Sequence, residues 1–297
     1  MNDSQKLAII SDFHMDINQF TPPELDLFKK ILLKEKVTHL HFAGDMSNDF
    51  YGLTVPYLVE LSAETGIVVT SNLGNHDMVG LTENEIEAND FQIFWFGQTA
   101  FVSFAGWYDY SFLKGKMSQK KLENFKKNFY FDRKIHRALD DILTTEKICQ
   151  QLNDVLSGLT HAKRIIVSMH FVPHHQFIIN TRYEKFEKFN AFLGSDRFHE
   201  IFMRFPNISD VVFGHIHHRY EPRKIKGIIY HARPLGYTYE WQMVDRFFHT
   251  YPTYQIPEMY HLRKRYNAIK NESAWLKFRQ SHLKKEFLSA LTLFEIN

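Results

Sequence analysis

Five short apolar runs that each end abruptly in polar residues constrain the fold of this chain more than any other feature. The runs cover residues 6–14, 37–45, 67–77, 162–170 and 208–218. Their length and their content of β-branched residues are typical of buried strands. Amphipathic helices are predicted over 22–36 and roughly 54–65, between the first three runs. Because strands and helices alternate, the sequence predicts an α/β core with parallel strands.

The polar residues at the ends of these runs are all potential metal ligands or catalytic groups. Parallel strands bring their carboxyl ends to one edge of a sheet, so we expect the five clusters to converge there. Two clusters contain a pair of residues two positions apart, which an extended segment would project to the same side. The clusters are Asp12 with His14, Asp45, Asn75 with His76 and Asp77, His170, and His215 with His217.

The donor types in these clusters indicate a metal site. Carboxylates, imidazoles and one amide oxygen, without a thiolate, suit Mn, Fe, Zn, Ni or Co better than copper(I) or an iron–sulfur cluster. Seven ligands with one shared carboxylate can supply two ions with about four ligands each. Two such ions can clamp both oxygens of an in-line displacement at phosphorus, with a hydroxide between them as the nucleophile. The seven candidates are Asp12, His14, Asp45, Asn75, His170, His215 and His217.

The order of these motifs resembles that of the calcineurin-like metallophosphoesterases. The chain contains Asp-x-His, Gly-Asp, Gly-Asn-His-Asp, a lone His after a strand, and Gly-His-x-His, in this order across residues 12–217. The resemblance implies that one metal is held by Asp12, His14, Asp45 and His217. It implies that a second metal is held by Asp45, Asn75, His170 and His215, so that Asp45 bridges the two ions.

The same resemblance implies roles for the next two residues of the Gly-Asn-His-Asp motif. His76 would face the substrate, where it stabilises the phosphoryl oxygens or protonates the leaving oxygen, and Asp77 would orient His76. The second motif, GDMSND, lacks the Asp-Arg-Gly continuation of the serine/threonine protein phosphatases, and the third ends in Asp rather than Glu. Both departures favour the phosphodiesterase and nuclease side of the family.

The resemblance also implies the fold, an α/β two-sheet αββα sandwich. We expect a catalytic domain over 1–245 with a helical insertion at about 80–160 near the cleft, where it would select the substrate. Residues 246–297 are periodic at helical spacing, so we expect a C-terminal helical extension packed on that domain. This extension has nine Lys or Arg residues against four Asp or Glu. Its basic face is either solvated or a surface for nucleic acid.

Three further residues are candidates for the lining of the substrate cleft. Trp107 could stack on a base or sugar, although a pair of core aromatic residues with Tyr108 would explain it equally well. His174 and His218 follow metal-ligand candidates closely in the sequence and could reach the cleft. Arg219 could hold a phosphate oxygen, and a solvated strand end is the alternative for His218 and Arg219.

The composition of the chain limits its partners and its compartment but does not indicate a function. The formal net charge of +2 does not demand nucleic acid or an anionic membrane as a partner. The single cysteine, Cys149, excludes an intramolecular disulfide and fits a reducing compartment. With no signal peptide and no apolar run of membrane-spanning length, a cytoplasmic protein without a membrane partner is expected. Oligomeric state has no sequence signal.

These observations predict a two-metal phosphoesterase that prefers phosphodiesters, with a small molecule or nucleotide as the phosphate-ester substrate. Three alternatives remain open from the sequence. The first is a phosphomonoesterase with the same core, and the second is a nuclease, supported only by the basic C-terminal region. The third is a non-catalytic metal-binding scaffold, which the complete set of ligands disfavours.

Overall fold

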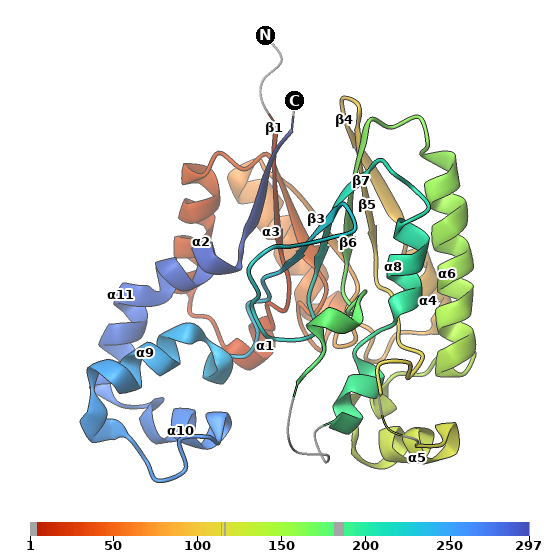
Figure 1. Cartoon of the computed structure of the whole chain (residues 1–297). Coiled ribbons are helices and arrows are strands. Elements are labelled where there is room, and N and C mark those ends of the chain that lie inside the picture. The colour runs from red at the N-terminus through yellow and green to blue at the C-terminus, as the bar shows by residue number, and fades with distance from the viewer. Residues whose placement is uncertain (1–4, 114, 116, 181–186, 297) are drawn as a thin grey trace.

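The computed structural model describes residues 5–113, 115, 117–180 and 187–296, and these form two packed β-sheets between layers of helices (Figure 1). The first sheet has the order β10-β1-β2-β3 and contains β1 (Gln5–Ile10), β2 (His39–Ala43), β3 (Val68–Asn72) and β10 (Thr292–Ile296). The second has the order β4-β5-β6-β7-β9-β8 and contains β4 (Gln92–Phe96), β5 (Thr99–Phe104), β6 (Arg164–Met169), β7 (Ile208–Phe213), β8 (Arg223–Ile225) and β9 (Ile228–Ala232). The predicted αββα sandwich is confirmed.

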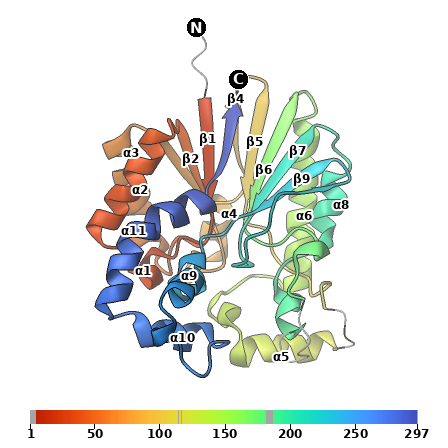
Figure 2. The ribbon, with the colours of Figure 1, turned by 60° about the vertical axis from the view of Figure 1, so that its left-hand side comes forward.

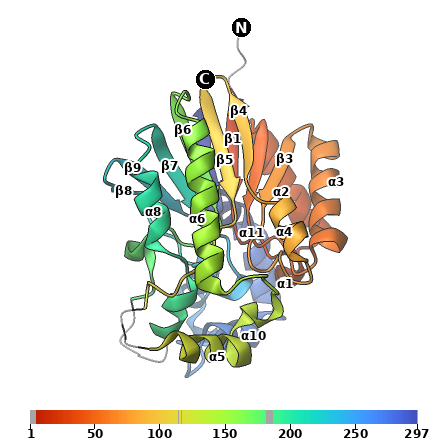
Figure 3. The same cartoon turned by 90° about the vertical axis from the view of Figure 1, so that its right-hand side faces the viewer.

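Helices flank both sheets and also gather at one end of the sandwich (Figures 2 and 3). The first sheet is covered by α2 (Pro22–Lys34), α3 (Val55–Thr65) and α11 (Ser273–Ala290), and the second by α6 (Asp141–Gly158) and α8 (Asp196–Phe202). The others are α1 (Met15–Asn18), α4 (Glu83–Ala88), α5 (Gln119–Phe129), α9 (Gln242–Thr250) and α10 (Leu262–Ile269). Short helical turns are η1 (Phe50–Thr54), η2 (Phe131–Lys134), η3 (His175–Phe177), η4 (Lys188–Phe192), η5 (Thr238–Glu240) and η6 (Pro252–Tyr254). Within the described ranges, every helix is too short or too polar to span a bilayer.

Strand β1 shows why the sandwich forms. Its alternate residues Leu7 and Ile9 are fully buried against the second sheet, where they pack with Ile166 of β6. The residues between them, Ala8 and Ile10, face the opposite way and pack with the helices that cover the first sheet. A strand that is apolar on both faces needs cover on both sides, which a helix–sheet–sheet–helix arrangement provides.

The C-terminal segment differs from the prediction. The helical period was expected to continue to the end, but α11 ends at Ala290 and residues 292–296 form β10. This strand pairs antiparallel with β1, and its residues alternate between buried and exposed. The two-residue alternation of TLFEI was missed because the longer helical period precedes it directly. The C-terminal residues therefore belong to the first sheet rather than to a purely helical extension.

The region around residues 80–160 is also less helical than expected. It contains β4, which was not expected, and β5, which confirms the strand that the sequence of residues 100–110 predicts. β5 pairs parallel with β6 inside the second sheet. After β5, α5 and η2 lie beside the carboxyl ends of the strands (Figure 2), whereas α6 returns to cover the second sheet. The domain boundary at residue 245 stays a prediction.

Candidate active site

The candidate ligands come from tight turns that directly follow the strands. Asp12, His14, Asp45, His215 and His217 all have positive φ angles, between 44° and 67°. The prediction that the two residue pairs project from extended segments is therefore wrong. A left-handed backbone turn follows β1, β2 and β7 and redirects these side chains toward the neighbouring strand ends. Backbone hydrogen bonds from Asp12 to Gly44 and from His14 to Asp45 join two of these turns.

Backbone amides and glycines fix the two carboxylates of the site. Oδ1 of Asp12 accepts a hydrogen bond from the amide of His215 at 3.0 Å, and Oδ1 of Asp45 accepts one from the amide of His76 at 2.8 Å. A Cβ atom on Gly214 would overlap the Asp12 carboxylate, and one on Gly74 would overlap the Asp45 carboxylate. The glycines are therefore needed so that the backbone can approach these oxygens closely.

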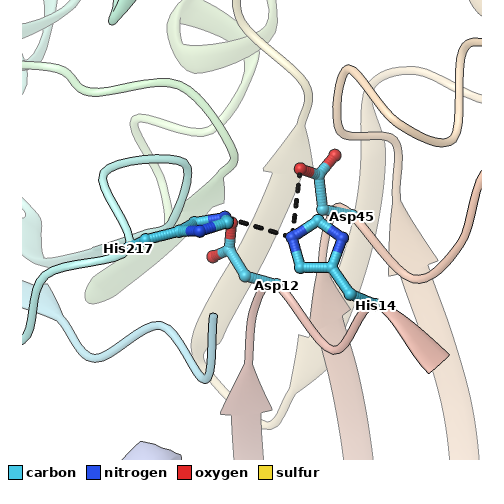
Figure 4. A group of neighbouring side chains, drawn as sticks. All are labelled: Asp12, His14, Asp45 and His217. Atoms are coloured by element: carbon cyan, nitrogen blue, oxygen red, sulfur yellow. Dashed lines mark hydrogen bonds and ion pairs between the residues drawn. The ribbon is translucent and has the colours of Figure 1, made fainter. Parts of the chain in front are cut away.

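Four residues form the first group of potential ligands (Figure 4). Nε2 of His14 lies 3.1 Å from Nε2 of His217 and 3.7 Å from Oδ2 of Asp45. Nε2 of His217 lies 3.0 Å from Oδ1 of Asp12. Two imidazole nitrogens and two carboxylates that point at one another in a buried space form a donor set that suits a divalent cation.

The second group shares Asp45 with the first. Asp45, His170 and His215 form a further cluster of potential ligands. Nε2 of His170 lies 3.4 Å from Oδ1 of Asp45 and 3.1 Å from Oδ1 of Asn75. All seven residues that the sequence indicated as ligands are thus brought together, and Asp45 lies between the two groups.

The outer nitrogens of three histidines are held by the protein. Nδ1 of His170 contacts the carbonyl oxygen of Ala43 at 3.1 Å, and Nε2 of His215 contacts that of Phe192 at 3.2 Å. Nδ1 of His217 contacts Oε2 of Glu240 at 2.7 Å. A ring nitrogen that donates to a carbonyl or carboxylate leaves the other nitrogen with its lone pair, and ligating histidines are held in this way. The residues present therefore fit two metal ions.

The electrostatics of the site favour bound positive charge. Burial alone would raise the pKa of Asp12, but the adjacent His217 outweighs burial and lowers that pKa to about 2. Burial disfavours a charged His170, yet Asp45 reverses this effect and raises its pKa to about 9. Burial lowers the pKa of His215 to about 3, so this imidazole is neutral. Burial would also raise the pKa of Asp45, but the surrounding histidines, His170 foremost, hold it well below its usual value. Both carboxylates are therefore ionised and stabilise cations in their surroundings.

His76 lies beside the first group and is oriented from both ring nitrogens. Nδ1 contacts Oδ1 of Asn48 at 2.9 Å, and Nε2 contacts the hydroxyl of Tyr237 at 3.0 Å. The amide of Asn48 is itself fixed, because its Nδ2 donates to Asp16 at 2.6 Å. Phe131 of η2 stacks on the His76 ring with centroids 3.9 Å apart.

Asp77 does not have the role that the resemblance implied. Its carboxylate accepts hydrogen bonds from four backbone amides, those of Asp45, Met46, Ser47 and Gly74. These bonds hold the turn after β2 against the turn after β3. In the part of the chain that the structure describes, Asn48 rather than Asp77 contacts Nδ1 of His76, which corrects the prediction.

A family model described as calcineurin-like phosphoesterase matches residues 5–219. The chain belongs to the calcineurin-like phosphoesterases. Members of this family use two divalent metal ions, and the two ligand groups that share Asp45 agree with that number. The family also makes the chain a metal-dependent phosphoric ester hydrolase by class.

Solved structures show the same fold in two other phosphoesterases. A phosphopantetheinyl hydrolase from Mycobacterium tuberculosis is 16% identical, with a TM-score of 0.60 over 82% of this chain and 93% of that chain. A dimetal phosphatase from Danio rerio is 14% identical, with a TM-score of 0.51 over 77% of this chain and 87% of that chain. The comparison with curated proteins finds no match.

Of the three candidates for the substrate lining of this calcineurin-like phosphoesterase, two are buried away from the ligand groups and one is exposed. Trp107 is fully buried and donates to Asp141 at 2.8 Å, so its expected role in stacking on substrate is wrong. His174 is also buried, and it packs against His175 and His199 rather than against the metal ligands. His218 is exposed beside Tyr220, and its role stays a prediction.

Arg219 is likewise not available for phosphate. It pairs with Glu286 of α11 at 2.7 Å and donates to the carbonyl oxygen of Pro234. This arginine holds the C-terminal helix against the turn that follows His217. Arg219 is not a solvated strand end either, because these partners bury most of its guanidinium group.

Several residues of the site were not found from the sequence. Asn48 follows Asp45 by three positions in GDMSND, and this fixed spacing is the signal that could have indicated it. Tyr237 and Glu240 lie in GYTYE after β9, which has no strand-end pattern of its own. Asp132 is buried and accepts a hydrogen bond from Nδ2 of Asn75 at 2.8 Å. Only the fold brings these segments to the site.

Proposed function

We propose that this calcineurin-like phosphoesterase hydrolyses phosphodiesters with the help of two divalent cations. The observation that carries the proposal is the pair of ligand groups that share Asp45. One cation would be held by Asp12, His14, Asp45 and His217, and the other by Asp45, Asn75, His170 and His215. When bound, the cations would neutralise charge at phosphorus and activate water for in-line attack. Their identity is left open, since nitrogen and oxygen ligands accept several metals.

His76 supplies the main catalytic group of the chain itself. Its Nε2 lies 3.9 Å from Oδ2 of Asp45, so the ring faces the place where a phosphate would bind. Because Oδ1 of Asn48 is an acceptor, Nδ1 of His76 is the donor and Nε2 is left to face the substrate side. When Nε2 also carries a proton, His76 would donate it in a hydrogen bond to a phosphoryl oxygen or transfer it to the leaving oxygen.

Two observations support a diester rather than a monoester. The motif GDMSND and the Asp at the end of GNHD depart from the protein-phosphatase pattern. In addition, within the described residues 5–113, 115, 117–180 and 187–296, the hydrogen bonds and ion pairs of the seven ligand candidates and His76 involve no lysine or arginine. A monoester dianion has one more negative charge than a diester and benefits more from such a cation.

The test compares an aryl phosphodiester with an aryl phosphomonoester in the manganese-loaded protein. We expect a higher kcat/KM for the diester, and loss of both activities after chelation. Asp45→Asn, purified in the same way, is the control for a contaminating phosphatase and should be inactive. A monoester preference would assign the chain to the phosphomonoesterases instead. No activity on either ester in a protein that holds two metals would favour the scaffold.

The substrate panel should then extend to natural diesters. The structural similarity to a phosphopantetheinyl hydrolase makes a phosphopantetheinyl diester one candidate, and cyclic nucleotides and single-stranded DNA are the others. Binding of DNA that weakens steeply with salt would favour the nuclease alternative. A cytoplasmic location agrees with the single cysteine and stays a prediction.

A further inference from the structure

The hydroxyl of Tyr237 lies on the substrate side of the site. It contacts Nε2 of His76 at 3.0 Å, and that nitrogen lies 3.9 Å from the Asp45 carboxylate that both ligand groups share. The tyrosine ring packs on the imidazoles of His14 and His217, each with a centroid distance of 4.5 Å. The side chain is partly exposed, unlike the fully buried Trp107. A phosphate bound by cations at the two ligand groups would therefore lie near this hydroxyl.

The backbone around Tyr237 is fixed to the ligand turns. Oε2 of Glu240 accepts a hydrogen bond from the Tyr237 amide at 3.0 Å and also contacts Nδ1 of His217. The amide of Gly236 donates to the carbonyl oxygen of Asp12 at 3.1 Å. Asn18 connects both sides of the turn, since its Nδ2 donates to the carbonyl oxygen of Gly236 and its Oδ1 accepts from the Thr238 amide.

The hydroxyl group of Tyr237 is not needed to pack the ring. An apolar ring would fill the space between His14 and His217 equally well, whereas the hydroxyl requires a polar partner. Its partner, Nε2 of His76, is the nitrogen that the contact with Asn48 leaves as an acceptor. Without substrate, the hydroxyl therefore donates its single hydrogen to Nε2 of His76.

We propose that Tyr237 is a catalytic residue, whose hydroxyl turns its single hydrogen from Nε2 of His76 to a non-bridging phosphoryl oxygen of the bound ester. This inference rests on the proposed function. No proton is transferred from the tyrosine, and the oxygen charge that develops during attack strengthens the bond. His76, protonated at Nε2, would then donate to the same phosphoryl group beside the hydroxyl of Tyr237.

Tyr237→Phe is the test, because it removes the hydroxyl and keeps the ring between the two imidazoles. We expect kcat to fall roughly 10- to 100-fold, which is the effect of one hydrogen bond to a charged acceptor. The content of two metals and the melting temperature should not change. Tyr239→Phe, which removes a hydroxyl two positions away, is the matched control and should keep its kcat. A Tyr237→Phe variant with full kcat would overturn the inference.

A double-mutant cycle separates direct contact from an effect through His76. If Tyr237 contacts the substrate, adding Tyr237→Phe to His76→Ala lowers kcat further by a similar factor. If it only holds His76, the double variant equals His76→Ala, and the inference is wrong.

Binding of orthophosphate to the manganese-loaded protein, measured by calorimetry, gives a readout that needs no turnover. Tyr237→Phe should weaken this binding by roughly tenfold, and unchanged affinity would also contradict the inference. A wild type that binds orthophosphate but cleaves no ester would refute the proposed function alone.

Discussion

Oε2 of Glu240 lies 2.7 Å from Nδ1 of His217, and the same oxygen accepts the amide hydrogen of Tyr237 at 3.0 Å. One carboxylate oxygen thus orients a candidate metal ligand and fixes the turn that presents a second site residue. Burial disfavours a charged His217, but Glu240 and Asp12 together raise its pKa well above the usual value. A residue that contacts the outer nitrogen of a ligating histidine sets both the orientation of the ring and the basicity of the nitrogen that faces the metal.

Glu240→Gln should therefore weaken metal binding without unfolding the protein. The amide keeps the size of the side chain but removes the charge beside Nδ1 of His217. We expect the affinity of the metal group that contains His217 to fall roughly 10- to 100-fold. Competition with a fluorescent chelator measures this affinity, and Glu221→Gln on the surface is the control. Equal affinities in Glu240→Gln and Glu221→Gln would show that the contact has no role in metal binding.

Asp45→Asn should remove metal and activity together. Its two oxygens lie near His14 in one group and near His170 in the other, so one lost charge affects both ions. Elemental analysis after gel filtration should show fewer than two metals per chain, and hydrolysis should be lost. Asp154→Asn on the exposed face of α6 is the control. An Asp45→Asn protein that retains two metals and full turnover would refute the assignment of Asp45 as the bridge.

Asn48→Ala should reduce turnover while metal content stays at two. Without Oδ1 of Asn48, Nδ1 of His76 loses its partner and the ring can rotate or change tautomer. We expect kcat to decrease roughly tenfold to a hundredfold, less than the full contribution of an acid or base. Steady-state kinetics with Asn128→Ala as the control checks this. Normal kcat in Asn48→Ala would show that Tyr237 and Phe131 suffice to hold the ring.

Asp77→Asn should act on stability instead of on His76. The carboxylate accepts four backbone amides, and an asparagine would turn an NH2 group toward some of them. We expect the free energy of unfolding to decrease by about 1–3 kcal/mol, the cost of an unsatisfied buried group. Urea unfolding measures this change, with Asp154→Asn again as the control. A large loss of kcat at unchanged stability would restore the orienting role that the family resemblance implied.

Two buried histidines on β2 should make the protein sensitive to acid. Burial lowers the pKa of His39 to about 4 and that of His41 to about 3, against 6.5 in the unfolded chain. Above pH 6.5 both states are neutral and the histidines have no effect. Below it the unfolded chain takes up protons that the folded protein refuses, so each histidine lowers stability by about 1.4 kcal/mol per pH unit until its folded pKa is reached.

Urea midpoints at pH 7 and pH 5 test this prediction. His39→Gln should reduce the loss of stability between the two pH values, because only His41 of this pair still titrates. The surface variant His136→Gln is the control. Identical losses in wild type and His39→Gln would show that His39 is not responsible for acid sensitivity.

Much of the fold could be predicted because local patterns specify it. The apolar runs that became β1, β2, β6 and β7 are mostly buried on both faces, and such strands are recognisable from composition alone. The run that became β3 was also predicted, although that strand is partly exposed. β10 was not predicted, because its five residues directly follow an 18-residue helix and form a strand only by pairing with β1. Pairing between the two ends of a chain has no local signal.

For the site, the sequence by itself determined the seven potential ligands and His76, since strand-end position and donor type are both local properties. The tertiary structure decided what surrounds them. It placed Trp107 in the core, gave Asp77 to backbone amides, and brought Asn48 and Tyr237 to the two nitrogens of His76. The contact between Tyr237 and His76 joins residues 161 positions apart. Its geometry depends on how the loops pack against one another, which no local sequence pattern specifies.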